Sequence, residues 1–206
     1  MNSVDGLRVA DCSMGPTIYI GIDQSINSTG ITVLGKGDPV YYLIVPHLTR
    51  KMKEVNHPRL MYVLYEKHKV GKDASYTEKE RAKTLNIYNI AYEIKKIINQ
   101  WQPKRVVMEG IAYGQAHSAA LADLAGLSYI IRTHILSTSS ELVIVSPSEL
   151  KRWATGNGVA EKGLMVYAWE ALDKIGKELN IKIDDLADSY FMAVYGRDLG
   201  DIQGIG

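Results

Sequence analysis

Short apolar runs separated by turn residues occupy the first part of the chain. Residues 17–23 are rich in β-branched and aromatic side chains and end on Asp23, which is typical of a β-strand. Two further apolar runs follow at 31–34 and 40–45, each after a short stretch of turn-forming residues. Three strands joined by short turns predict an antiparallel meander. Residues 1–16 lack this pattern, and we expect them to be an N-terminal extension.

The second part of the chain alternates helical and strand patterns. Thr77 and Glu80 match a capping box, and apolar residues recur at helical spacing from there to Ile98. The later predicted elements are a strand at 105–108, a small-residue helix at 116–131, a strand at 142–145, and helices at 148–153, 159–178 and 185–196. This order predicts an α/β fold: a mixed five-stranded sheet, an antiparallel meander followed by parallel strands, with helices on both faces.

A basic stretch at 46–76 interrupts the pattern. It holds seven lysine or arginine residues against three acidic ones. Its interior at 60–65 is apolar and aromatic, and it fits either another strand or a helical turn. We interpret the stretch as a basic insertion or connection, although a solvated surface excursion explains it equally well.

Composition limits the kind of protein. The chain has 206 residues, 46% hydrophobic and 23% charged, which suits one globular domain over 17–198 followed by a short tail at 199–206. Its 24 basic and 23 acidic residues give a net charge of +1, which excludes binding to nucleic acid by bulk charge alone. No apolar run reaches the roughly 20 residues of a membrane span. Because the start carries no secretory signal and the single Cys12 has no disulfide partner, we expect a cytoplasmic protein without membrane contact.

Four carboxylates occupy positions where open sheets commonly hold ligands. Asp23 and Glu109 each follow an apolar strand directly, so we expect both at the carboxyl edge of the sheet. Asp185 and Asp188 are three residues apart and therefore share one face of the last helix. Because the rest of that helix is apolar, the pair must lie beside a packing face, where negative charge is costly unless a cation is bound.

The four carboxylates together predict a site for two divalent cations. Mg²⁺ and Mn²⁺ prefer such oxygens, and two ions roughly 3.5–4 Å apart make a phosphoryl-transfer site. Each acid also has a plainer explanation, since a strand-end aspartate is often a turn former and Asp184 or Asp185 would cap the last helix. Asp184 and Asp185 are alternatives as the ligand, because both can reach the face of Asp188.

The segments that carry these acids resemble the RuvC family of Holliday junction resolvases. The similar segments, in chain order, are Gly21-Ile22-Asp23-Gln24-Ser25 with Thr29-Gly30, Val107-Met108-Glu109, the glycine turn Thr155-Gly156-Asn157-Gly158 between Lys151 and Lys162, and Asp185-Leu186-Ala187-Asp188. The resemblance spans 18–195, and the lysine-flanked glycine turn is its most specific part. The chain departs from the family in its N-terminal extension and its longer 46–76 stretch, which suggests a viral member.

The resemblance implies an RNase H-like fold and a homodimeric, metal-dependent endonuclease that cuts four-way DNA junctions. The residues that would bind two Mg²⁺ ions, with Mn²⁺ as a substitute, are Asp23, Glu109, Asp185 and Asp188. Lys151 and Lys162 would lie beside the scissile phosphate and steady its charge. The family uses an aromatic residue shortly after the second acid at the branch point of the junction, and Tyr113 is the nearest candidate here.

Further expectations concern DNA and a partner subunit. The candidate phosphate contacts are Arg50, Lys51, Lys53, Lys104, Arg105, Lys151, Arg152 and Lys162. With no helix-turn-helix, zinc-finger or RRM signature, recognition would rest on DNA shape and phosphate positions. A four-way junction has an approximate two-fold axis, which a two-fold dimer matches. The small residues at 116–126 suit a close interface between subunits, and they suit packing on the sheet equally well.

Three other functions share parts of this pattern. An actin-like kinase or ATPase has a similar first phosphate loop, but it needs two such domains and a second glycine-rich loop. Another nuclease of the same fold would cut other branched DNA or an RNA–DNA hybrid. A junction-binding protein with a weak or inactive metal site is the third alternative, and the presence of all four acids argues against it.

Overall fold

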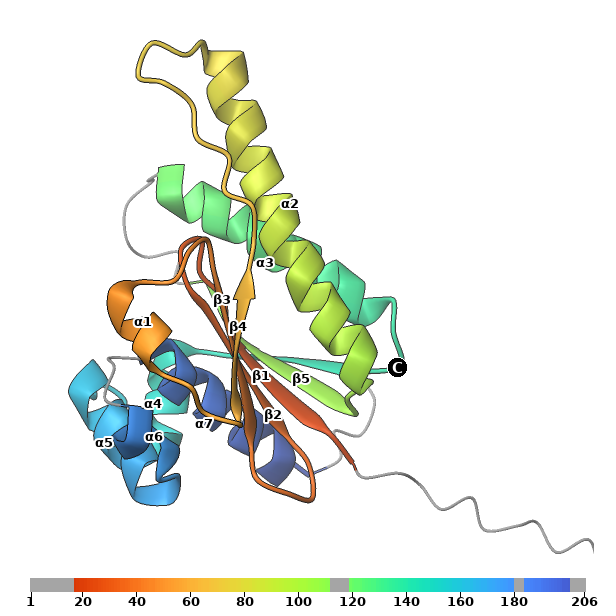
Figure 1. Cartoon of the computed structure of the whole chain (residues 1–206). Coiled ribbons are helices and arrows are strands. Elements are labelled where there is room, and N and C mark those ends of the chain that lie inside the picture. Colours follow the sequence, from red (N-terminus) through yellow and green to blue (C-terminus); the bar gives the residue numbers. More distant parts are fainter. Residues whose placement is uncertain (1–16, 112–118, 180–183, 201–206) are drawn as a thin grey trace, which may run out of the picture.

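The computed structural model describes residues 17–111, 119–179 and 184–200. Its centre is a six-stranded sheet in the order β4-β3-β2-β1-β5-β6 (Figure 1). The strands are β1 (Tyr19–Asp23), β2 (Thr29–Leu34), β3 (Val40–Val45), β4 (Leu60–Leu64), β5 (Arg105–Glu109) and β6 (Glu141–Val145). β2 runs antiparallel to β1 and β3, and the other neighbouring pairs are parallel. All strands except β2 therefore end at one edge, which we call the carboxyl edge.

Helices cover both faces of the sheet, which confirms the predicted α/β architecture (Figure 1). They are α1 (Arg50–Glu54), α2 (Tyr76–Trp101), α3 (Ala119–Leu136), α4 (Pro147–Thr155), α5 (Lys162–Leu172), α6 (Ile175–Leu179) and α7 (Asp184–Asp198). Ile94 of α2 and Leu127 of α3 are buried with Ile22 of β1 in one core cluster. Trp169 of α5 and Phe191 of α7 belong to the cluster on the opposite face. No helix within the described ranges has the length and apolar character needed to cross a membrane.

The sheet has six strands, and the predicted number of five was wrong because residues 60–64 form β4. Backbone pairing joins β4 to β3 in parallel, from Tyr41 opposite Leu60 to Val45 opposite Leu64. A short apolar run fits a strand or a helix equally well by pattern alone. The otherwise unpaired edge of β3 decides the outcome, because it offers β4 a ladder of backbone donors and acceptors.

Side-chain capping moves the start of α2 from its predicted position. The N-cap is Ser75 rather than Thr77, so the helix begins at Tyr76. Ser75 Oγ accepts the backbone N–H of Glu78, and the Glu78 carboxylate accepts the backbone N–H of Ser75 at 2.8 Å. The capping box is therefore real but lies two residues earlier than the Thr77–Glu80 pair, since both pairs fit the same sequence pattern.

A second capping effect divides the helix predicted at 159–178. The structure has two helices there, because Asp173 adopts extended backbone and ends α5. Its carboxylate then accepts the backbone N–H of Ile175 at 3.1 Å, where α6 begins. Aspartate competes in this way with the helical hydrogen bonds of its own neighbours, which an apolar periodicity does not detect.

α7 lies directly on β1 and β2 because two strand positions beneath it are glycines. A Cβ atom at Gly21 would lie 2.0 Å from the carbonyl oxygen of Ser189, and one at Gly30 would lie 2.2 Å from that of Asp185. Ser189 Oγ also shares a buried hydrogen bond of 2.8 Å with Thr32 Oγ1. Because Gly30 pairs with the last residue of β1, this contact places the first turn of α7 at the carboxyl edge.

Arg105 holds the other end of α7, which corrects its prediction as a phosphate contact. Its side chain is 1% exposed, and its Nε lies 2.6 Å from Glu141 Oε2. The terminal nitrogens donate to the backbone carbonyl oxygens of Gly196, Leu199 and Gly200. The guanidinium thus satisfies carbonyl groups at the C-terminal end of the helix, where a positive charge is favourable.

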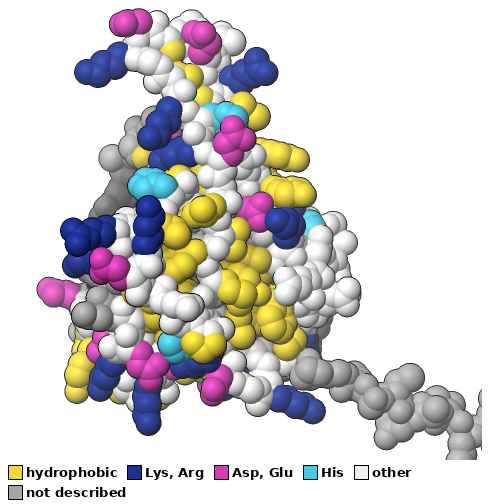
Figure 2. Space-filling model, in the orientation of Figure 1, with side chains coloured by type: hydrophobic (Ala, Val, Ile, Leu, Met, Phe, Trp, Pro, Cys, Tyr) yellow, Lys and Arg dark blue, Asp and Glu magenta, His cyan; other side chains and the backbone are white. Residues whose placement is uncertain are grey.

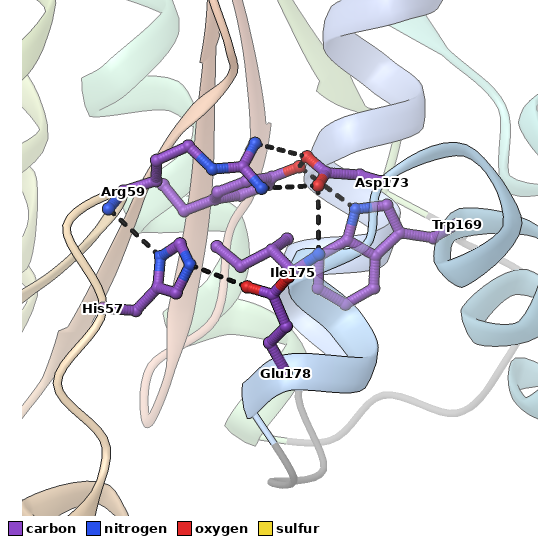
Figure 3. Close-up of polar contacts among 7 residues, drawn as sticks. His57, Arg59, Trp169, Asp173, Ile175 and Glu178 are labelled. Atoms are coloured by element: carbon purple, nitrogen blue, oxygen red, sulfur yellow. Dashed lines mark hydrogen bonds and ion pairs between the residues drawn. The ribbon is translucent and has the colours of Figure 1, made fainter.

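A polar network ties the connection between β3 and β4 to α5 and α6 (Figure 3). The Arg59 guanidinium donates two hydrogen bonds to the Asp173 carboxylate, at 2.9 and 2.7 Å, and Tyr41 Oη donates a third at 2.7 Å. His57 Nε2 lies 3.0 Å from Glu178 Oε2 in the same region. Burial by itself would raise the pKa of Asp173, but the hydrogen bonds outweigh it and lower that pKa.

Gly30→Ala is expected to destabilise the protein by at least about 1–3 kcal/mol, because the new Cβ would overlap the backbone of Asp185 and push α7 away. Gly37→Ala, in the turn between β2 and β3, is the matched control, since nothing lies within 4 Å of a Cβ placed there. We expect this control to stay within about 0.5 kcal/mol of the parent protein. Urea unfolding measures both variants, and equal stabilities would contradict the described packing.

Asp173→Asn is expected to lower the free energy of unfolding at pH 7 by about 1–3 kcal/mol, because it leaves the Arg59 guanidinium without its anionic partner. The pKa of Asp173 is lower in the folded chain than its unfolded value of about 3.9. The carboxylate therefore stabilises the fold above about pH 4 and loses this effect as the pH falls through the folded pKa.

Urea unfolding at pH 7 and about pH 3 tests this dependence on the Asp173 charge. The difference between Asp173→Asn and the parent should shrink at the lower pH. Glu54→Gln is the control, because it removes an exposed ion pair with Arg50 and should change stability little. A difference that is the same at both pH values would show that the Asp173 charge does not stabilise the fold.

Candidate active site

Two carboxylates follow neighbouring strands at the carboxyl edge. β1 and β5 are parallel with Ile22 opposite Met108, so Asp23 and Glu109 come next at equivalent positions. The Gln24 side chain joins the two strand ends, because its Nε2 donates to the carbonyl oxygen of Glu109 at 3.1 Å. Gln24 Oε1 is buried and has no hydrogen-bond partner among the residues that the structure describes. A buried acceptor without a donor is a group that a bound cation or an ordered water commonly satisfies in proteins.

The first turn of α7 supplies two more carboxylates. Ser28 Oγ, in the turn between β1 and β2, donates a hydrogen bond of 2.5 Å to Asp185 Oδ2. Asp188 follows one helical turn later, and the charges of Asp185 and Asp188 both raise the pKa of Asp23. This arrangement favours Asp185 over Asp184 as the site residue, because Asp185 is held by the neighbouring turn and acts directly on Asp23.

Burial and repulsion from nearby carboxylates raise the pKa values of all four carboxyl groups. Burial is the largest cause in each case, and nearby carboxylates add to it. The pKa of Asp23 lies well above its usual range, and the pKa of Glu109 is raised to about 7. The pKa of Asp188 is raised to about 6, and that of Asp185 is raised despite the hydrogen bond from Ser28. Negative charge is therefore costly here until a counter-charge arrives.

Two lysines bring positive charge to the same site. Lys151 lies on α4, and Lys162 is the first residue of α5. Gly156 ends α4 in the left-handed conformation, with φ of 76°, and so turns the chain toward α5. Both lysines lower the pKa values of Glu109 and Asp188 against the effect of burial. The glycine turn thus places the two lysine side chains within electrostatic reach of the carboxylates.

The other candidate DNA contacts lie on different parts of the fold. Those on α1 are Arg50, Lys51 and Lys53. Lys51 lines a cleft that Glu178 of α6 also borders. Arg152 lines a separate hollow beside Tyr195 of α7. Tyr113 lies outside the described residues.

The donor set fits divalent cations by its chemistry. Carboxylate oxygens, with the buried amide oxygen of Gln24 nearby, are hard ligands of the kind that Mg²⁺ and Mn²⁺ prefer. A cation would also relieve the repulsion that raises the four pKa values. In their present positions, no three His, Cys, Asp or Glu side chains among the residues that the structure describes could bind one ion together. One edge of the sheet thus carries carboxylate oxygens that could bind cations and two lysine side chains that could bind an anion.

Sequence patterns did not identify two residues that shape this site. Ser28 contacts an aspartate 157 residues away, and Gln24 contacts a strand end 85 residues away. Both follow Asp23 closely, in a stretch that reads as a turn. Turn chemistry was therefore the only available signal, and it does not reveal such distant partners.

Solved structures of known proteins share this fold. The structure of Thermus thermophilus RuvC is 15% identical in sequence, with a TM-score of 0.52, over 86% of this chain and 92% of that one. T. thermophilus RuvC in complex with Holliday junction substrate is 10% identical, with a TM-score of 0.55, over 86% of this chain and 90% of that one. At these identities the likeness concerns the fold, and it agrees with the expected RNase H-like architecture.

A family model gives the evidence from sequence, whereas no curated protein matches the chain. The model described as crossover junction endodeoxyribonuclease RuvC matches residues 67–195, which is more than half of the chain. The matched range contains the site residues Glu109, Lys151, Lys162, Asp185 and Asp188, and Asp23 precedes it. The chain therefore belongs to the RuvC family of crossover junction endodeoxyribonucleases.

Proposed function

We propose that this protein resolves four-way DNA junctions by paired, metal-dependent hydrolysis of phosphodiester bonds. The observation that carries the proposal is a set of interacting charged side chains at the carboxyl edge: Asp23, Glu109, Asp185, Asp188, Lys151 and Lys162. Membership of the RuvC family supports the reaction class. The similar structure of T. thermophilus RuvC with Holliday junction substrate supports the substrate class.

Each charged group has a proposed part in the reaction. The residues that would hold two Mg²⁺ ions, or Mn²⁺ in their place, are Asp23, Glu109, Asp185 and Asp188. When bound, the ions supply an activated water and stabilise the leaving oxygen. Lys162, with Lys151 near it, would lie beside the scissile phosphate and offset the charge that grows on it. Ser28 orients the Asp185 carboxylate, and Gln24 fixes the strand end that carries Glu109.

Further DNA contacts are proposed away from the metal ligands. The proposed phosphate contacts are Arg50, Lys51, Lys53 and Arg152, and Tyr113 is proposed for the branch point. Phosphate contacts fix the position of DNA without reading its sequence. Recognition would therefore depend on the branched shape of the substrate.

A homodimer is the proposed active form, because two opposed cuts need two sites related by a two-fold axis. α3 offers a surface for the interface. Its sequence combines small residues with large apolar side chains at the surface, where Tyr129 is 51% and Leu136 is 69% exposed. An apolar surface on one helix suits contact with a second copy of the chain.

Asp188→Asn is expected to reduce cleavage of a synthetic four-way junction in Mg²⁺ by at least about 100-fold, because it removes a negatively charged carboxylate that would bind the metal ion. Junction binding in Ca²⁺ or in EDTA should remain close to that of the parent. Cleavage on denaturing gels and binding by fluorescence anisotropy measure the two effects. Asp198→Asn, an exposed position at the far end of the same helix, is the matched control and should cut normally.

The same cleavage assay tests the substrate class. Four-way, three-way, linear duplex and RNA–DNA hybrid substrates should be compared with and without Mg²⁺. Resolution of four-way junctions by symmetrical cuts supports the proposal. Preferential cutting of the hybrid, or normal cleavage by Asp188→Asn, would overturn it.

The solution mass of the protein is expected to be about twice that of one chain. Leu136→Asp should shift the protein toward the monomer, because it places a charge in the proposed interface on α3. Leu172→Asp on α5 is the control, since Leu172 is 65% exposed, much like Leu136. Light scattering after size-exclusion chromatography measures all three proteins, and a monomeric parent would exclude the paired-cut mechanism.

A further inference from the structure

Residues 65–83 form a projection that we call the prong. It consists of the loop after β4 and the first two turns of α2, and it extends beyond the sheet and the other helices (Figure 1). α2 has 26 residues, or about 39 Å of helix, whereas five-residue strands span about 17 Å. Apart from Ala82, the buried residues of α2 lie between Ile90 and Ile98. The first part of α2 therefore adds little to the core.

Hydrogen bonds to α2 hold the loop of the prong in place. The Asn86 side chain accepts the backbone N–H of His68 at 2.7 Å and donates to the carbonyl oxygen of His68 at 3.0 Å. Asn89 Nδ2 donates to the carbonyl oxygen of Glu66 at 2.8 Å. The capping box of Ser75 closes the tip. A helix end with little tertiary packing is stabilised by such contacts. The hydrogen bonds therefore give the prong a defined position on α2.

The prong carries lysine and arginine side chains around the exposed aromatic ring of Tyr76. Six of its residues are lysine or arginine, and four are acidic. The Glu78 carboxylate accepts hydrogen bonds from Ser75, and Glu80 pairs with Lys83 at 2.8 Å, so two of the acids are engaged locally. Figure 2 shows both charge types around the tip, where Tyr76 is 79% exposed.

Three lysines of the prong are well placed to bind an external anion. Lys69, Lys72 and Lys79 are exposed, and none of them forms an ion pair with a described residue. Lys79 Nζ donates to the carbonyl oxygen of Lys72 at 3.1 Å, which keeps the two lysines together. Cations combined with an exposed aromatic ring suit nucleic acid, which offers phosphates and apolar sugar or base surface side by side.

The base of the prong is attached to the turn that follows Asp23. Tyr65 Oη donates to the carbonyl oxygen of Ile26 at 2.9 Å, and Lys67 Nζ donates to Asn27 Oδ1 at 3.0 Å. β4 is parallel to β3, so the chain enters the prong from the carboxyl edge of the sheet. The prong therefore projects from the same edge of the sheet at which the proposed function places the scissile phosphate.

We propose that the prong is a second DNA-binding element, in which Lys69, Lys72 and Lys79 bind phosphates of the duplex arm next to the cut and Tyr76 contacts its sugars or bases. This inference rests on the proposed nuclease function, because it places the same DNA on a second surface. The prong extends the contact with a junction arm away from the metal ligands. It therefore makes binding depend on arm length.

The triple variant Lys69→Gln, Lys72→Gln, Lys79→Gln tests the proposal in EDTA, where binding is measured without cleavage. The probe is a fluorescent four-way junction with arms of about one or about two helical turns. The log–log slope of affinity against salt concentration should fall by about 3, one unit for each lost phosphate contact. The loss of affinity should be larger for the longer arms. Hydroxyl-radical footprints should lose protection on the duplex arm in both the triple variant and Tyr76→Ser.

Lys36→Gln, Lys174→Gln, Lys177→Gln is the matched control, because it removes the same charge from the turn between β2 and β3 and from the chain around α6. It should keep the parental slope and footprint. A prong variant with the parental slope and footprint overturns the proposal, while cleavage by the parent would leave the nuclease function standing. If the prong variant changes its solution mass but not its DNA binding, the prong is a contact between two copies of the chain. This result also overturns the proposal. If the parent neither binds nor cuts the junction, the nuclease function itself fails.

Discussion

The direct contact of α7 with β1 and β2 is the constraint on which the rest of the site depends. At Gly21 and Gly30 no strand side chain separates the helix from the sheet, so the backbone carbonyl groups of Ser189 and Asp185 lie close against the strands. Arg105 holds the far end of the helix, and the Ser189–Thr32 hydrogen bond lies between. Glycine is unfavourable in a strand interior, and here that local cost is offset by close helix–sheet packing. The result is that a helix and a strand from opposite ends of the chain meet at one edge.

Electrostatic repulsion among the acids is the consequence of this packing. Carboxyl groups that are both buried and close together resist ionisation, as the raised pKa values of Asp23, Glu109 and Asp188 indicate. Stability alone would favour neutral side chains at such positions. Lys151 and Lys162 offset part of the negative charge, and divalent cations would offset more. If the site binds ions and phosphate as proposed, it exchanges folding stability for that function.

The residues between β3 and α2 give the sheet a sixth strand and a projecting surface. β4 covers the edge of β3, and the Arg59–Asp173 ion pair fastens the connection between these two strands to α5 and α6. The chain then leaves the carboxyl edge and forms the prong. Because β4 is parallel to β3, it delivers the prong to the edge that carries the acids. An antiparallel strand would have delivered it to the opposite edge.

The sequence by itself determined the α/β class, the strand ends that carry Asp23 and Glu109, and the helical spacing of Asp185 and Asp188, because these follow from local periodicity and spacing. It also carried the resemblance to the RuvC family, which the family match confirms. Only the tertiary structure decided that residues 60–64 form a strand, that Arg105 is buried, and that Ser28 and Gln24 support the acids. Each of those outcomes depends on a partner many residues away, on a free strand edge or on buried carbonyl groups. Local pattern contains no information about such partners, since chain topology alone brings them together.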